Sequence, residues 1–128
     1  MSDFSSAFSV STSGLRAHAA RLRHVSENIA NTDTPGYRRK SVAFEANSQS
    51  EHGGVQLGQV RLDQKDLKRV FDPSHPMADD TGHFSGSNVD LVIEIADARE
   101  AQRSYEANLK MFDQTRQMST ALMDLLRR

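Results

Sequence analysis

The 128-residue chain has the length of one ordinary domain, and its composition is 37% hydrophobic but only 6% aromatic, without tryptophan, which favours helix packing over a dense aromatic core. Its 16 Lys and Arg side chains nearly balance 17 Asp and Glu, and the formal net charge of −1 excludes a strong overall field that would attract nucleic acid or anionic lipid. The absence of cysteine excludes disulfide bonds and thiolate chemistry.

The first 23 residues lack the basic start and the continuous apolar stretch of a cleaved signal peptide. No segment approaches the roughly 20 apolar residues that cross a bilayer, so we expect no direct membrane insertion. If the protein leaves the cytoplasm, we expect an export route that does not read a cleaved signal.

Residues 4–31 have the apolar spacing of an amphipathic helix. Four of the apolar residues form a strict seven-residue series: Phe8, Leu15, Leu22 and Ile29. The positions three residues further on are mostly polar, and Gly14 lowers the helix propensity. We therefore predict a helix that needs a partner for stability. It should end before Thr34, because Pro35 disfavours helical geometry in the residue before it.

Residues 33–86 form a turn-rich middle region, which contains all the prolines and most of the glycines. Strand-like patterns occur at 42–45, 55–57, 60–62 and 67–71. Gly58 predicts a bulge or a bend. We therefore expect a small region of β-hairpins and loops between two helical ends.

From residue 88 to the end, neither glycine nor proline interrupts the helical period. We expect Ser87 or Asn88 to cap this helix. At about 1.5 Å per residue, the helix would be on the order of 60 Å long, which exceeds what a domain of this size ordinarily contains. The acidic residues near the start of the helix are expected on solvated faces. These residues are Asp90, Glu94, Asp97 and Glu100.

The two helical ends are expected to meet along an apolar seam. On the second helix the seam consists of Tyr105, Leu109, Phe112, Leu122, Met123 and Leu126. Residues 121–126 are apolar almost all round, so we expect other subunits to cover what one partner helix cannot. The alternative interpretation is that the apolar stripes pack only on each other, inside a monomeric helical hairpin.

These patterns predict a mainly α fold. The terminal segments 1–32 and 87–128 are expected to pair as a coiled-coil-like hairpin of two long helices, and 33–86 is the small β-containing middle region.

Two stretches resemble a known family. Residues 26–39, with the sequence SENIANTDTPGYRR, are similar to the signature of the flagellar rod and hook proteins, in which a helix ends in an Asn-rich turn followed by Thr-Pro-Gly-Tyr. The matching positions are Asn28, Asn31, Thr34, Pro35, Gly36 and Tyr37. Residues 71–82 and 88–108 resemble the FlgC branch of this family, and the short length agrees. The compact turn is more similar to other axial proteins, so the related rod protein FlgB is the alternative.

The resemblance implies a structural subunit of the proximal flagellar rod, which transmits motor torque across the periplasm. It implies export through the flagellar type III apparatus and assembly with copies of itself and with the rod proteins FlgB, FlgF, FlgG and FliE. The turn motif would shape the path from the first helix into the middle region.

Two other clusters of polar residues give only weak indications of a binding site. A metal site could be imagined at His75, Asp79, Asp80 and His83, but a solvated turn explains these residues and we predict no metal. The basic run 38–40 is too short for a nucleic-acid footprint, and we favour a structural role with ion pairing to a neighbouring subunit.

The sequence contains no Ser-His-Asp order, phosphate-binding glycine loop or nucleotide fingerprint, so we predict neither an enzyme nor a cofactor. The alternative function from another class is a soluble coiled-coil adaptor that binds one partner helix.

Overall fold

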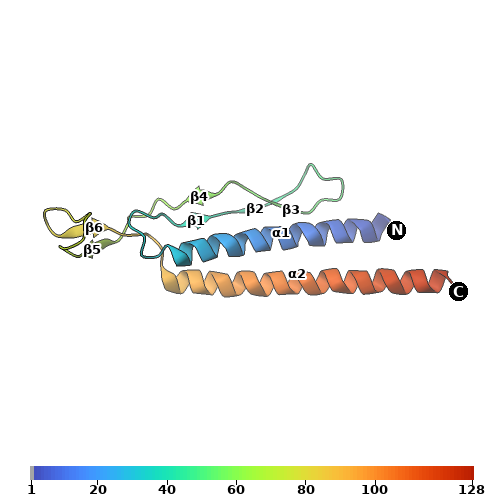
Figure 1. The fold of residues 1–128 in the computed structure, drawn as a ribbon. Coiled ribbons are helices and arrows are strands. Elements are labelled where there is room, and N and C mark those ends of the chain that lie inside the picture. The colour runs from blue at the N-terminus through green and yellow to red at the C-terminus, as the bar shows by residue number, and fades with distance from the viewer. Residues whose placement is uncertain (1) are drawn as a thin grey trace.

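The fold is a long pair of antiparallel helices with a strand-rich segment folded along one of them (Figure 1). The computed structural model describes residues 2–128. Helix α1 spans Ser2–Ala30 and helix α2 spans Leu91–Leu126, and both chain ends lie at the same end of the molecule. The prediction of a mainly helical fold with two long terminal helices is confirmed. No helix within residues 2–128 is both long enough and apolar enough to cross a bilayer.

The end of α1 follows from the turn residues after it. The N–H of Tyr37 donates to the carbonyl of Thr34 at 3.2 Å, and Gly36 has a φ of 75°. Proline at the second position and a left-handed glycine at the third are typical of a type II turn. The helix therefore ends where the sequence predicts, before Thr34.

The start of α2 differs from the prediction. Asp90 is the N-cap, and its carboxylate accepts a hydrogen bond from the N–H of Val92 at 3.1 Å. Capping by Ser87 or Asn88 is wrong, because both side chains bond to other segments of the chain: the Ser87 hydroxyl donates to the carbonyl of Thr32, and the Asn88 amide bonds to the middle region.

The middle region forms three two-stranded antiparallel ladders. Their strands are β1 (Lys40–Ser41), β2 (Phe44–Ala46), β3 (Val55–Leu57), β4 (Arg61–Leu62), β5 (Arg69–Phe71) and β6 (His83–Ser85). Because β1 pairs with β4 and β2 pairs with β3, residues 40–62 make one long hairpin. The β5–β6 pair is a second hairpin, which projects past the helices at the end opposite the termini (Figure 1).

The predicted strands are in the right places, but most of their boundaries differ from those of the structure. The strand predicted at 55–57 coincides with β3, and those at 60–62 and 67–71 contain β4 and β5. The bulge or bend predicted at Gly58 lies next to it: the N–H of Gly58 still donates to the carbonyl of Ala43, but two residues separate β1 from β2 whereas three separate β3 from β4. Strands β1 and β6 are not predicted, since runs of two or three residues acquire their pairing from tertiary context.

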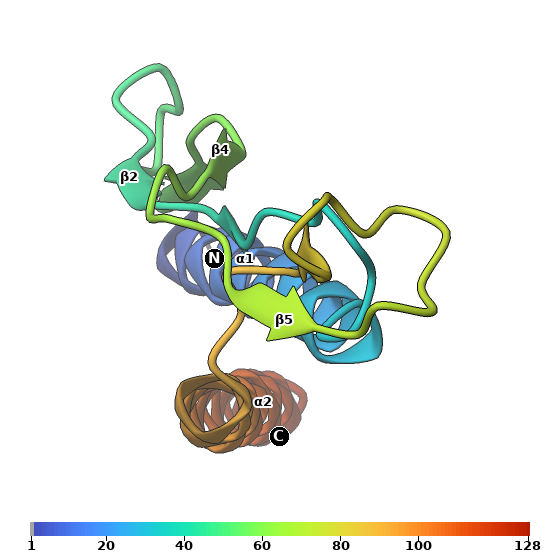
Figure 2. The same cartoon turned by 90° about the vertical axis from the view of Figure 1, so that its left-hand side faces the viewer.

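Helix α1 lies between two layers, whereas α2 has only α1 beside it along most of its length (Figures 1 and 2). The long hairpin contacts α1 through β1 and β3. The N–H of Val55 donates to the hydroxyl of Ser13 at 3.0 Å, and the rings of His18 and Phe44 meet edge to face at 5.1 Å. Within residues 2–128, one side of α2 is therefore left without a partner.

The two helices approach each other closely where their side chains are small. Ala101, on the side of α2 that faces α1, is completely buried. At Gly14, an added Cβ would lie 2.0 Å from the Nδ2 atom of Asn108 on α2. Gly14 lowers helix propensity, and the structure shows that it also leaves room for the Asn108 side chain.

A larger side chain at Gly14 should therefore separate the helices. We expect Gly14→Leu to lower the free energy of unfolding by about 1–3 kcal/mol, as overpacking does. Thermal unfolding followed by circular dichroism at high protein concentration measures this loss. The matched control is Ser9→Leu on the exposed face of α1, which should change stability little. Equal melting temperatures for the two variants would contradict the close approach.

Candidate functional site

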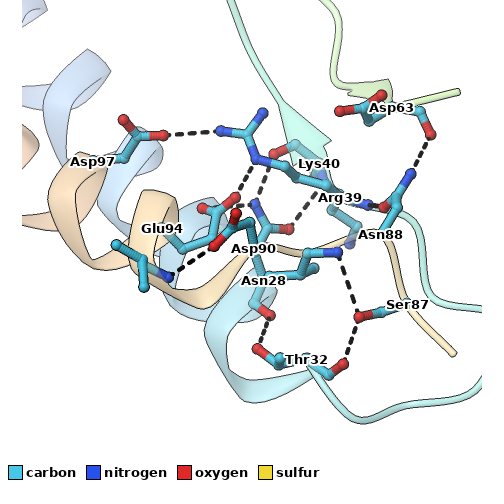
Figure 3. A network of polar contacts seen from close by, with 12 residues as sticks. Asn28, Thr32, Arg39, Lys40, Asp63, Ser87, Asn88, Asp90, Glu94 and Asp97 are labelled. Carbon is cyan, nitrogen blue, oxygen red and sulfur yellow. Dashed lines mark hydrogen bonds and ion pairs between the residues drawn. The ribbon is translucent and has the colours of Figure 1, made fainter. Parts of the chain in front are cut away.

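The turn-motif residue Asn28 is completely buried at the junction of the two helices and the middle region (Figure 3). Its Nδ2 group donates to the carbonyl of Lys40 at 2.9 Å and to Glu94 at 3.3 Å. Its Oδ1 atom accepts from the Tyr37 hydroxyl at 2.8 Å and from the N–H of Lys40 at 2.9 Å. The amide thus uses both of its N–H donors and both lone pairs of its oxygen. The side chain can therefore be buried without leaving a hydrogen-bonding group unpaired.

Glu94, in the first turns of α2, is also completely buried. The Nε atom of Arg39 donates to one of its carboxylate oxygens, and the Nη2 atom of Arg39 donates to Asp97 at 2.9 Å (Figure 3). The expectation that Glu94 lies on a solvated face is wrong. A carboxylate can be buried only when it is paired and hydrogen-bonded, and here Arg39 and Asn28 meet that requirement.

The other turn-motif residues close the end of α1. Asn31 donates through Nδ2 to the carbonyl of Glu27 at 2.8 Å and accepts from the Thr34 hydroxyl at 3.0 Å. The N–H of Gly36 donates to the carbonyl of Ser85, the last residue of β6, at 3.2 Å. Pro35 is half-buried. The motif therefore links the end of α1 to the segment that leads into α2.

Asn88 joins the middle region to the same junction. Its Oδ1 atom accepts from the N–H of Arg39 at 2.7 Å, and its Nδ2 group donates to the carbonyls of Asp63 at 2.8 Å and Lys65 at 3.1 Å (Figure 3). The guanidinium of Arg38 donates to the same two carbonyls. We call Asn28, Ser87, Asn88, Glu94 and Arg39 the polar junction.

The charges of the junction are matched within the chain. Burial would lower the pKa of Arg39, but its hydrogen bond and ion pair with Glu94, assisted by Asp97, raise that pKa above its ordinary value. A hydrogen bond of 3.0 Å between Lys40 and Glu27 raises the pKa of the lysine and lowers that of the carboxyl group. The ion pairing expected between the basic run 38–40 and a neighbouring subunit is thus formed inside the chain by Arg39 and Lys40.

A groove of about 310 Å³ beside the junction is lined by α1, the first strands and Asp97. Its cations already have acidic partners: Arg21 lies 3.5 Å from Glu100, and Lys40 contacts Glu27. The groove therefore does not provide the unneutralised positive charge that would hold a phosphate or another anion.

The residues of the apolar seam are only partly brought together. The rings of Phe8 and Phe112 meet edge to face, with centroids 5.2 Å apart. Half-buried seam residues are Leu15, Leu22, Ile29 and Tyr105. Exposed seam residues are Leu109 (47%), Leu122, Met123 and Leu126 (73%). Most of the α2 half of the seam thus faces solvent in the isolated chain.

Residues 75–83 form the tip of the β5–β6 hairpin. Asp79 accepts hydrogen bonds from the hydroxyl and the N–H of Thr81 at 2.6 and 2.9 Å and from the N–H of His83 at 3.1 Å. These bonds, with the charge of Arg69 nearby, lower the pKa of Asp79 to about 2. The carboxylate organises the turn, which is the structural role favoured for this cluster.

Sequence reasoning missed the role of Glu94, although a signal for it exists. Glu94, Ala101 and Asn108 are spaced by seven residues, and all three lie on the side of α2 that faces α1. Gly14 and Asn28 are their counterparts on α1, fourteen residues apart. A seven-residue series of small and polar residues is a less familiar sign of an interface than the apolar series beside it.

Comparison with known proteins agrees with this geometry. One family model, described as flagella basal body rod protein, matches residues 8–38, and another, described as the C-terminal part of flagellar basal body rod FlgEFG proteins, matches residues 80–125. The chain is 44% identical to the flagellar basal-body rod protein FlgC of Agrobacterium fabrum, over 99% of this chain and 98% of the relative. The chain belongs to the FlgC family. FlgC proteins of Escherichia coli O6:H1 and Salmonella typhimurium are each 32% identical, over 92% of this chain and 94% of the relative.

The resemblance to the FlgC branch is thereby confirmed, and this FlgC-family chain is a structural subunit of the flagellar basal-body rod. The two family matches contain most of the two helices together with the junction residues Asn28, Ser87, Asn88 and Glu94. The middle hairpin of residues 40–62 lies outside both matches. The two family models thus match the helical pair and the segments that fasten it.

Removing the cation that neutralises Glu94 should be costly. We expect Arg39→Met to lower the free energy of unfolding by about 3–5 kcal/mol, because it leaves a buried carboxylate without its charged partner. Adding Glu94→Gln to this variant should recover part of the loss. Urea unfolding of the two single variants and the double variant measures the coupling.

The matched control for this cycle is Arg69→Met, which breaks the exposed ion pair with Asp79. Solvent screens that pair, so we expect Arg69→Met to lower the free energy of unfolding by at most about 1 kcal/mol. Similar losses for Arg39→Met and Arg69→Met would contradict a structural role for the buried pair.

Proposed function

We propose that this chain is a building block of the proximal rod, in which α1 and α2 pair in a coiled-coil-like manner and form the wall of the rod together with neighbouring subunits. Its partners are copies of itself and the rod proteins FlgB, FlgF, FlgG and FliE. It is exported by the flagellar type III apparatus without a cleaved signal, acts in the periplasm as part of the drive shaft, and has no enzymatic activity.

The observation that carries this proposal is the exposed apolar surface of α2. Large apolar side chains are exposed from its first turn to its last, including Leu91, Val92, Leu109 and Leu126. A 36-residue helix is about 54 Å long at 1.5 Å per residue, so these side chains extend along the whole helix, on more than one of its sides, rather than forming a small patch. Monomeric proteins seldom leave so much apolar surface exposed, which supports its burial by other subunits.

The division of the chain supports the same proposal. The helical pair, with the polar junction at its end, would be the rod core domain, and the middle region 33–86 would lie beside it as an appendage. Within residues 2–128, no group of three or more His, Asp or Glu side chains is placed to hold a metal ion. The polar side chains at the junction are engaged in hydrogen bonds to each other, as structural groups are.

Charges on the α2 half of the seam should block assembly. We expect Leu109→Asp and Phe112→Asp to abolish rod assembly and swimming, because a buried charge without a partner is costly. Motility plates and mass spectrometry of purified hook-basal bodies measure the two effects. Gln114→Asp, at an exposed position on the same helix, is the matched control and should swim. Normal swimming of both seam variants would contradict the proposal, as would absence of the unaltered chain from hook-basal bodies.

The adaptor alternative makes a different prediction for purified protein. A rod subunit should have poorly ordered terminal helices at low concentration, because much of the helix stability comes from packing against other subunits. An adaptor should instead form a small oligomer that resists proteases. Circular dichroism and limited proteolysis over a range of concentrations distinguish the two.

A further inference from the structure

The β5–β6 hairpin is a stiff projection with an apolar tip. It extends past the helices at the end opposite the termini (Figure 1). The rings of His75 and Phe84 stack at 3.9 Å, and those of Phe71 and His83 are 5.0 Å apart, so the two strands and the connecting loop brace each other. Phe71 is nevertheless 65% exposed and Met77 64% exposed. The apolar side chains are held in place but not covered.

The same hairpin carries unneutralised negative charge. Arg69 pairs with Asp79 at 3.1 Å. Asp72 accepts hydrogen bonds from Ser74, but within residues 2–128 neither Asp72 nor Asp80 forms an ion pair. Two carboxylates without a cationic partner among the described residues thus accompany the exposed apolar side chains.

The opposite end of the molecule has the complementary character. Phe8 lies against Phe112 in an antiparallel pair, so the last turns of α2 extend past the start of α1 (Figure 1). Leu125 is 66% exposed and Leu126 73% exposed. Arg127 and Arg128 follow them, and neither arginine has an ion pair within the part of the chain that the structure describes.

We propose that the β5–β6 hairpin of one copy docks on the C-terminal end of α2 of a second copy. Phe71 and Met77 would pack on Leu125 and Leu126, while Asp72 and Asp80 would face Arg127 and Arg128. The two surfaces lie at opposite ends of an elongated molecule, so the contact is head to tail and does not close on itself, as an open array requires. This docking deepens the proposed function, on which it rests, by naming the surfaces that join copies end to end.

The absence of cysteine from the chain allows a direct test by disulfide cross-linking. Purified Met77→Cys protein is mixed at high concentration with a size-tagged Leu126→Cys protein and oxidised. Head-to-tail docking predicts that the mixed 77–126 adduct exceeds both the 77–77 and the 126–126 adducts. Glu51→Cys, at an exposed position in the loop of the other hairpin, is the matched control and should give little mixed adduct with Leu126→Cys.

Charge reversal then tests the ionic part of the contact. Asp80→Arg in the first protein or Arg128→Asp in the second should each reduce the mixed adduct about two- to five-fold, and the two reversals together should restore it.

A mixed adduct no more abundant than the Glu51→Cys control would overturn the docking, as would a double reversal that fails to restore the yield. Because this test uses purified protein, such a failure is separate from the hook-basal-body experiment, which tests the rod function itself.

Discussion

The buried carboxylate of Glu94 is the constraint on which the rest of the structure depends. An ionised group without access to water must have a cation and hydrogen-bond donors in fixed positions, and Arg39 and Asn28 supply them. Asn28 lies in the last turn of α1, Arg39 directly precedes β1 and Glu94 lies in the first turn of α2, so satisfying one carboxylate fixes three segments relative to each other (Figure 3). If the two helices paired out of register, the carboxylate of Glu94 would be buried without its partners. The junction therefore selects the register of the helix pair as well as stabilising it.

The contact between the helices combines small and polar residues with the ring pair Phe8–Phe112, and this affects what the outside of the molecule can do. Ala101 and Gly14 allow the backbones to approach, while many of the large apolar residues of α2 stay exposed. If the apolar seam alone joined α1 to α2, little apolar surface would remain for other subunits. The helical pair is therefore held together internally while large apolar side chains remain exposed along α2.

The two helices are covered unequally by the rest of the chain. The long hairpin covers α1 on the side away from α2, and hydrogen bonds such as that from Val55 to Ser13 fasten it there (Figure 2). Helix α2 has no such cover, so it is the helix that neighbours can reach. The second hairpin extends the molecule at one end and the last turns of α2 extend it at the other (Figure 1). This FlgC-family subunit thus exposes apolar side chains along its side and at both ends.

The sequence by itself determined the two helices, the turn between α1 and the middle region, an irregularity near Gly58 and the family. These features depend on local chemistry: the helical period, the φ values that proline and glycine accept, and a contiguous motif at 26–39. Only the tertiary structure decided that Asp90 caps α2, that Glu94 is buried, and that β1 and β6 form. Each depends on partners distant in the chain, since Arg39 reaches Glu94 across 55 residues and Ser87 is diverted from capping by its bond to Thr32. A charged residue on a helix has the same local pattern whether it faces water or a guanidinium, and only the packing of the segments distinguishes the two.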